Sequence, residues 1–253
     1  MDKRILIVHG WMESSKRYNK VKEYIESNTE YRVELFECYG FGDTTAIRSR
    51  NKTIPYSALA ISDKISTNSY DYIIGFSMGT SVILRALDEV INKPKVILIN
   101  PVYSGLLSLL PVILITPILP VVFICIKYIS TEALRILGKP FLRLLFNNVE
   151  RNTDELFYKD IRKADTLTAV STLLYMILDD WMVSKDFSRD TEVNMIISTN
   201  DKVVTKRVIR KLKEDLKHMN EFRIKDASHM VFMENFSEVC LIICSILKGK
   251  LVT

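Results

Sequence analysis

Residues 75–79 read Gly-Phe-Ser-Met-Gly, directly after the apolar run 70–74 and directly before a helical pattern. A sharp strand-to-helix turn needs small residues on both sides of its apex, because Cβ atoms there would collide with neighbouring backbone. Such a turn lifts a serine hydroxyl clear of the sheet, and the following helix presents unpaired N–H groups to a developing negative charge. The spacing therefore makes Ser77 a candidate nucleophile, with Gly75 and Gly79 as the small residues of the turn.

A serine nucleophile needs a base that accepts its proton and an acid that orients the base. The sequence contains three histidines. His229 follows the last predicted strand, so we expect it at the same sheet edge as Ser77 and predict that it is the base. His9 follows the first predicted strand. His218 lies in a highly charged helical pattern and is predicted to be a surface residue.

The acid predicted from the sequence is Asp201, which follows the fifth predicted strand and so also stands at a carboxyl end. A turn aspartate beside a basic helix is the alternative interpretation of this residue. Asp226 lies too close in sequence to His229 to approach it from another strand. Asp179 and Asp180 fall within a predicted helix, where a solvated or capping role fits better.

Acyl transfer also needs hydrogen-bond donors for the oxyanion, and the loss of one donor typically costs about 100- to 1000-fold in rate. The residue after the nucleophile, Met78, supplies one backbone N–H. The loop that opens at Gly10 after the first strand is placed to supply the second, and we predict the N–H of Trp11. A turn with the Trp11 ring packed on the core is compatible with this role, because only the backbone donates.

The elements that must position these residues follow from alternating patterns. Short apolar, β-branched runs alternate with longer amphipathic ones, which is typical of parallel strands joined by crossover helices. The predicted strands are 4–8, 32–36, 71–75, 95–99, 193–198 and 222–225. The predicted helices are 18–27, 57–67, 78–91, 205–219 and 236–248. We therefore predict an α/β fold with a doubly wound, mostly parallel sheet, whose ligand sites lie beyond the carboxyl ends of the strands.

A long insertion separates the fourth and fifth predicted strands. Residues 102–190 have helical patterning without a convincing strand, and amphipathic helices are predicted at 131–147 and 167–183. An insertion of this length forms a subdomain rather than a loop. We predict a helical, apolar cap over the carboxyl edge of the sheet, on a core formed by residues 1–101 and 191–253.

Residues 105–126 contain no charge and have roughly the length of a membrane-spanning helix. They also contain Pro111, Pro117 and Pro120, each of which removes a backbone hydrogen bond and kinks a helix. Both a spanning segment and an apolar cap that lines a pocket or touches a membrane stay open, and we favour the cap. The apolar stretch 5–8 is too short for a signal peptide, so the expectation is a cytoplasmic protein that could contact a membrane peripherally.

Composition excludes several classes of protein. With 253 residues and 48% apolar content, the chain can bury a core. The 35 basic against 30 acidic residues are a mild excess, which gives no support to nucleic-acid binding. No histidine–carboxylate cluster or phosphate-binding glycine loop implies a metal or organic cofactor. The four cysteines lack Cys-x-x-Cys spacing and are predicted to be buried free thiols: Cys38, Cys125, Cys240 and Cys244.

Taken in chain order, these features resemble an α/β-hydrolase. The shared features are the Gly-x-Ser-x-Gly turn, the loop His9-Gly10-Trp11 after an early strand, and the order Ser77, Asp201, His229. The resemblance spans nearly the whole chain. Two differences stand out: the chain starts directly on the strand before the loop, and the first third of the cap is unusually apolar and proline-rich.

The resemblance implies a serine hydrolase that cleaves a carboxylic ester or thioester with an apolar acyl group through an acyl-enzyme. An acyltransferase would use the same residues, and a ligand-binding or membrane-docked protein could keep the fold without turnover. Epoxide and haloalkane hydrolases are disfavoured, because those relatives have an aspartate at the position of Ser77. The expected partner is a small-molecule, lipid-like ester.

Overall fold

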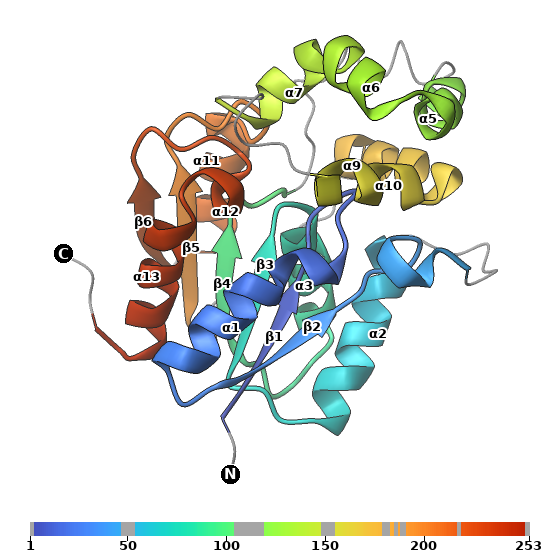
Figure 1. The fold of residues 1–253 in the computed structure, drawn as a ribbon. Helices are drawn as coiled ribbons and strands as arrows, with labels where there is room; N and C mark the ends of the chain where they lie inside the picture. Colours follow the sequence, from blue (N-terminus) through green and yellow to red (C-terminus); the bar gives the residue numbers. More distant parts are fainter. Residues whose placement is uncertain are drawn as a thin grey trace.

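The structure is a computed structural model that describes residues 3–46, 54–103, 119–147, 155–178, 183–184, 187, 191–216 and 219–250. Its strands form one parallel sheet in the order β2-β1-β3-β4-β5-β6 (Figure 1). They are β1 (Arg4–Val8), β2 (Arg32–Phe36), β3 (Tyr72–Phe76), β4 (Lys95–Ile99), β5 (Val193–Ser198) and β6 (Met219–Ile224). The order runs outward from β1 in both directions, which confirms the predicted doubly wound α/β sheet.

Helices cover both faces of this sheet, and the strands alternate between them. Ile5 and Ile7 of β1 pack with α1 (Asn19–Asn28) and α13 (Phe236–Leu247) on one face. Leu6 and Val8 pack on the other face with α2 (Ile54–Thr67), α3 (Met78–Asp88) and α11 (Lys206–Asp215). Because both faces of the sheet are covered, the central strands β1, β3 and β4 read as nearly continuous apolar runs.

The last strand differs most from its prediction. It was predicted at 222–225, but β6 begins at Met219 and pairs with β5 from Val193 onward. Its first five residues are half-buried or exposed, since β6 is an edge strand, and they lack the apolar run that signals a strand. The helix predicted over 205–219 therefore ends earlier, at Asp215. A smaller error is in β3, which lies one residue later than predicted.

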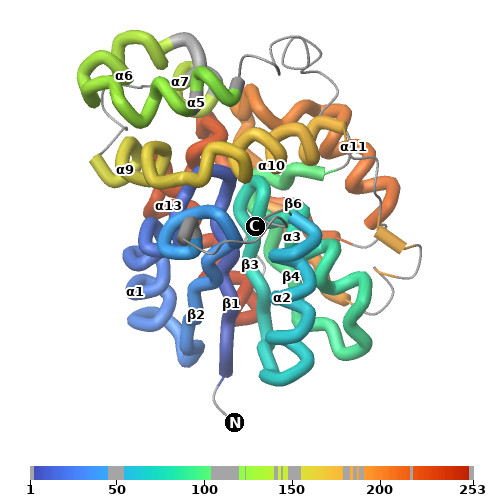
Figure 2. The backbone as a smooth tube through the Cα atoms, turned by 90° about the vertical axis from the view of Figure 1, so that its right-hand side faces the viewer, coloured from blue at the N-terminus to red at the C-terminus, as the bar shows by residue number. Residues whose placement is uncertain are grey.

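A group of helices from the described residues between β4 and β5 lies beyond the carboxyl ends of the strands in both views, and we call them the cap helices (Figures 1 and 2). They are α5 (Leu119–Tyr128), α6 (Thr131–Leu137), α7 (Lys139–Leu145), α9 (Glu155–Lys163) and α10 (Thr166–Leu178). Helices α9 and α10 lie next to the sheet edge, whereas α5, α6 and α7 form an outer layer.

The single helix predicted over 131–147 is two helices. Gly138 ends α6 and precedes α7, and its N–H is bonded to the Leu134 carbonyl oxygen at 2.9 Å. Pro140 follows in the first turn of α7, where a missing N–H costs no helical hydrogen bond. The helix predicted over 167–183 ends at Leu178, and residues 179–182 lie outside the described residues.

Most of the uncharged segment 105–126 lies outside the described residues, including Pro111 and Pro117. Pro120 stands in the first turn of α5 and so removes no helical hydrogen bond. Within the described ranges, every helix is too short or too polar to cross a membrane. The predicted free thiols are confirmed, but Cys125 is exposed on α5, whereas the other three are buried.

Candidate active site

Ser77 stands at a strained turn between β3 and α3. Its φ of +50° lies in a region that non-glycine residues rarely adopt. A Cβ on Gly75 would lie 2.6 Å from the Ile83 side chain, and one on Gly79 would overlap the Val8 carbonyl oxygen. Both positions therefore require glycine, as the sequence predicted, and the turn places the serine hydroxyl at the carboxyl end of β3.

The side chains of Ser77, His229 and Asp201 form one hydrogen-bonded chain. His229 Nδ1 lies 2.7 Å from Asp201 Oδ2, and His229 Nε2 lies 2.8 Å from Ser77 Oγ. A carboxylate only accepts hydrogen bonds, so Nδ1 carries the proton and Nε2 accepts from the serine hydroxyl. Ser77 is 6% exposed and His229 is 3% exposed. The geometry lets the imidazole accept the serine proton while the carboxylate stabilises the resulting cation.

The acid is itself held by backbone donors. Asp201 Oδ1 accepts hydrogen bonds from the N–H groups of Val203 at 2.8 Å and Val204 at 2.9 Å. These bonds leave Oδ2 for the histidine. The Phe76 ring packs beside the imidazole, with centroids 5.4 Å apart. Asp201 is thus held by its own loop, and the His229 ring is held against β3.

The three residues predicted from the sequence are therefore brought together, and their catalytic roles stay a prediction. Asp226 stands in the turn after β6 at a φ of +55°, where its N–H binds Thr199 Oγ1. His218, Asp179 and Asp180 lie outside the described residues.

Asn100, which the sequence analysis missed, links the acid strand to the base loop. It follows β4 with a φ of +43° and is 1% exposed. Its Nδ2 donates to Ser198 Oγ at 2.9 Å and to the His229 carbonyl oxygen at 2.8 Å. Its Oδ1 accepts from the Ser198 N–H at 2.8 Å. A polar residue at the end of an apolar strand was the only available signal, and it equally suits an ordinary turn.

The first predicted oxyanion donor is the N–H of Met78, the first residue of α3. An N–H in the first turn of a helix has no acceptor within that helix. The second predicted donor, Trp11, lies in the loop formed by residues 9–14, which we call the β1 loop. The Trp11 ring packs partly on the core, and its Nε1 donates to the Ala169 carbonyl oxygen of α10 at 3.0 Å. The β1 loop is thus anchored to a cap helix.

Glu13 holds the β1 loop from within. Its Oε2 accepts from the Gly10 N–H at 2.9 Å and from the Tyr18 hydroxyl at 2.7 Å. A Cβ on Gly10 would lie 2.8 Å from this same oxygen and 3.0 Å from the Phe76 ring, so a larger residue would push the Glu13 carboxylate out of its place. Burial, followed by the neighbouring Glu13, raises the pKa of Tyr18 well above its ordinary value. The tyrosine therefore stays a hydrogen-bond donor to the carboxylate.

A buried ionic cluster joins the β1 loop to α9. Arg17 Nε lies 3.7 Å from Glu13 Oε1 and 3.9 Å from Asp160 Oδ2. Asp160 Oδ2 also accepts from the Ser14 N–H at 3.2 Å. Burial raises the pKa of Asp160, although Ser14 and Arg17 oppose this shift. This cluster was not predicted from the sequence, because its members come from the core and the cap.

His9 is buried below the β1 loop and is held there by its neighbours. Its Nδ1 lies 2.7 Å from the Gly10 carbonyl oxygen, and its Nε2 lies 3.0 Å from the Cys38 backbone nitrogen. Glu37 Oε1 lies 3.1 Å from the same Nε2. These contacts give His9 a structural role in shaping the loop.

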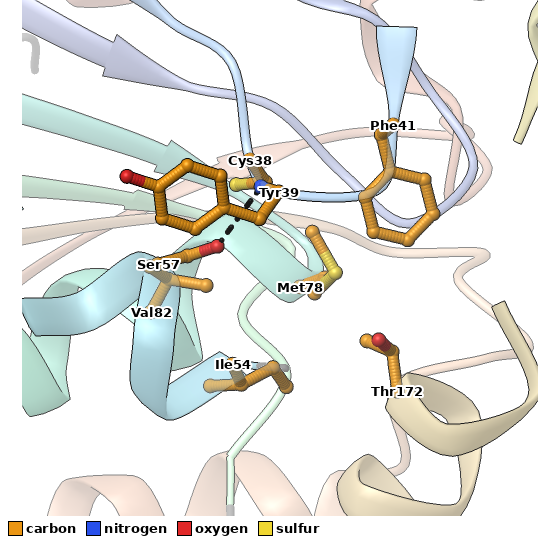
Figure 3. Close-up of a pocket in the computed structure, with 8 residues that line it drawn as sticks. All are labelled: Cys38, Tyr39, Phe41, Ile54, Ser57, Met78, Val82 and Thr172. Carbon is orange, nitrogen blue, oxygen red and sulfur yellow. Dashed lines mark hydrogen bonds between the residues drawn. The ribbon is translucent and has the colours of Figure 1, made fainter. Parts of the chain in front are cut away.

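A small pocket lies directly beside the Ser77 turn (Figure 3). The empty space in and around it, which includes open solvent, is about 160 Å³. It is lined by Cys38, Tyr39, Phe41, Ile54, Ser57, Met78, Val82 and Thr172. Ser57 Oγ accepts from the Tyr39 N–H at 3.2 Å. Thr172 Oγ1 is buried and has no hydrogen-bond partner within the part of the chain that the structure describes. The pocket is therefore mainly apolar, with one hydroxyl in its wall on the side of α10.

The chemistry of the described residues centres on the serine. Among the ranges given above, no three His, Cys, Asp or Glu side chains are grouped as metal ligands would be.

Comparisons with known proteins place this geometry in context. Residues 5–240 match the model of the Alpha/beta hydrolase family. Among solved structures, a carboxylesterase from the thaumarchaeon Nitrososphaera gargenis has a TM-score of 0.68 at 13% identity, covering 98% of this chain and 90% of that one. MenH from S. aureus has a TM-score of 0.73 at 15% identity, covering 98% and 94%. An esterase from Exiguobacterium antarcticum has a TM-score of 0.72 at 15% identity, covering 97% and 92%. No curated protein matches the chain.

Proposed function

The chain belongs to the alpha/beta hydrolase family, and from this premise we propose that it is a serine hydrolase that cleaves a carboxylic ester or thioester through an acyl-enzyme. Family membership supports a hydrolase-type activity. The observation that carries the finer proposal is the hydrogen-bonded chain from Asp201 through His229 to Ser77 at the turn after β3.

In the first half of the reaction, Ser77 Oγ attacks the acyl carbonyl carbon and His229 Nε2 takes the hydroxyl proton. The Asp201 carboxylate stabilises the imidazolium through Nδ1–H. Negative charge moves to the carbonyl oxygen, which the N–H groups of Met78 and Trp11 are proposed to bind. The tetrahedral intermediate collapses when Nε2–H protonates the leaving alcohol or thiol, and the acyl group stays on Ser77.

In the second half, water replaces the leaving group. His229 Nε2 takes a proton from water, whose oxygen attacks the acyl carbonyl carbon. The collapse of this second intermediate returns the proton to Ser77 Oγ and releases the carboxylic acid. No other group needs to transfer a proton.

The pocket beside Met78 supports an acyl group as the part of the substrate that is recognised there. Apolar side chains from three elements line it, among them Phe41, Ile54 and Val82. We therefore propose that an apolar acyl group of the substrate binds there.

The test uses a serine-reactive fluorophosphonate and a series of p-nitrophenyl esters of increasing acyl length. Wild type should be labelled and should hydrolyse the short esters, and Ser77→Ala should do neither. Ser66→Ala, at an exposed site on α2, is the matched control and should behave as wild type. Turnover that survives in Ser77→Ala would contradict the proposal, and so would a wild type that binds esters without labelling or turnover.

A further inference from the structure

The outer layer of the cap is unusually apolar for a surface. Twelve large apolar side chains are exposed among the described residues, and half of them stand on the two short helices α5 and α6. We call these six the outer cap face: Val121, Val122, Ile124, Tyr128, Ile136 and Leu137. Tyr128 is 85% exposed and Leu137 is 72% exposed. Large apolar side chains that are exposed together on short helices point to a site of interaction.

The packing of α5 and α6 shows which sides are already used. Ile126 of α5 packs against the buried apolar residues of both faces of the core, and Leu134 of α6 is buried. With 3.6 residues per turn, Val121, Val122, Ile124 and Tyr128 cover nearly half of the α5 circumference. A surface helix is normally polar over such an arc. This part of α5 therefore lacks the polar side chains that an ordinary helix presents to solvent.

The charges around this face identify the kind of partner. Helices α5, α6 and α7 carry four basic residues, Lys127, Arg135, Lys139 and Arg143, and one acidic residue, Glu132. Lys127 and Arg143 are exposed. Exposed apolar side chains combined with basic residues are typical of helices that lie in the interface of an anionic bilayer.

The residues at the end of α5 also favour lipid. Tyr128 and Lys127 stand together at the end of α5, as expected where a helix meets headgroups, because both have an apolar body and a polar tip.

We propose that the outer cap face docks on an anionic lipid bilayer, with α5 and α6 in the interface and Lys127 and Arg143 on the headgroups. This docking does not depend on the proposed hydrolase chemistry. It would, however, place the bilayer one helical layer from the pocket, because α5 packs on α10. Thr172 of α10 lines the pocket.

The test measures co-sedimentation with vesicles of phosphatidylcholine alone and of about seven parts phosphatidylcholine to three parts phosphatidylglycerol. The full chain with Ser77→Ala is used, so that no lipid is consumed. Strong binding to the anionic vesicles and weak binding to the neutral ones is expected. Val121→Asp with Ile124→Asp should lower the anionic partition by about tenfold or more. Lys127→Gln and Arg143→Gln should each lower it about fivefold.

Two control variants match these changes elsewhere on the surface. Ile91→Asp alters an apolar side chain that is 91% exposed between α3 and β4. Lys20→Gln with Arg32→Gln removes two positive charges, one from α1 and one from β2. This is the charge that Lys127→Gln and Arg143→Gln remove together. Both controls should bind the anionic vesicles as the parent does. Circular dichroism and thermal melts verify that each cap variant is folded.

Absence of vesicle binding would overturn the proposal, as would equal binding to both vesicle types or equal loss in the controls. Size-exclusion chromatography tests the alternative that a second copy of the chain binds this face. If the parent is an oligomer that Val121→Asp with Ile124→Asp converts to a monomer, and no vesicle binding occurs, the face joins two copies of the chain and lipid docking is wrong. Failure of fluorophosphonate labelling would overturn the hydrolase proposal alone.

Discussion

The side-chain amide of Asn100 donates a hydrogen bond to the carbonyl oxygen of His229 at 2.8 Å, across 129 positions of the sequence. The same side chain binds both the hydroxyl and the N–H of Ser198, three residues before the acid. One buried residue at the end of β4 therefore sets the spacing between the loop that carries the base and the loop that carries the acid.

Replacing Asn100 should impair turnover beyond any effect on folding. Asn100→Ala leaves the Ser198 N–H and the His229 carbonyl without this partner, so the imidazole loses its alignment. A misplacement of about 1 Å can cost on the order of 100-fold in rate. We expect kcat for a p-nitrophenyl ester to fall by that order, with a smaller change in KM.

The matched control is Asn194→Ala. Asn194 is also buried on the sheet, but its side chain pairs with Glu192 and Asn220, away from the site. Both variants should lose stability, because each leaves buried polar groups unpaired. Only the Asn100 variant should lose kcat per labelled active site, and equal losses in both would assign Asn100 a purely structural role.

Glu13→Gln should slow turnover by loosening the β1 loop. The carboxylate binds both the Gly10 N–H and the Tyr18 hydroxyl, and a glutamine keeps its size but weakens both bonds because the charge is lost. A donor that binds the oxyanion acts mainly in the transition state, so kcat should fall more than KM rises. Steady-state kinetics on a short ester would measure both, and an increase in KM alone would contradict the assigned role.

Stability should fall with rising pH through the titration of Asp160. Burial raises the pKa of this carboxyl in the folded protein above its ordinary value of 3.8. Between those two pKa values the folded state holds more protons than the unfolded state, so the free energy of unfolding decreases as the pH rises. In Asp160→Asn, the melting temperature should depend less on pH across this window than in wild type. An unchanged pH dependence of the melting temperature would contradict the raised pKa.

Thr172→Val should stabilise the protein, because it removes a buried hydroxyl without a partner among the described residues. The replacement keeps the shape of the side chain. Removing an unpaired buried polar group is expected to add on the order of 1 kcal/mol to the free energy of unfolding. Denaturant titration would measure the gain. A loss of stability would mean that the hydroxyl is satisfied in solution.

The four thiols should react at very different rates with a disulfide reagent. Cys125 is exposed, whereas the others are buried. Burial raises the pKa of Cys240 to about 12, so its reactive thiolate is scarce at neutral pH. We expect one fast thiol in the native protein, lost in Cys125→Ser, and all four in denaturant. A fast phase that survives in Cys125→Ser would contradict the exposure found on α5.

The sequence predicted the elements with a strong local signal. Strands β1, β2, β4 and β5 have the predicted bounds, and in β1 and β4 a continuous apolar run marks a strand that is buried on both faces. The edge strand β6 was partly missed, since its exposed half has no such run. The break between α6 and α7 did have a local signal, a glycine two positions before a proline, and the periodic pattern outweighed it.

The residues of the candidate site were likewise predictable only in part. Ser77, Asp201 and His229 could be predicted, because the carboxyl ends of parallel strands meet at one sheet edge. Asn100 and Glu13 could not be predicted, because their partners are set by tertiary contacts that leave no periodic trace in the sequence. Asp160 was equally hidden, since it belongs to the cap and acts on a loop of the core.

The hydrogen bond from the Trp11 ring to α10 links the β1 loop of the core to a cap helix through one residue. Its backbone N–H is the proposed second oxyanion donor, while its indole Nε1 donates to the Ala169 carbonyl oxygen of α10. Any outward movement of α10 must therefore break this hydrogen bond or move the β1 loop with it. In the proposed hydrolase, either outcome would displace the Trp11 donor, so turnover would require α10 to stay packed on the β1 loop.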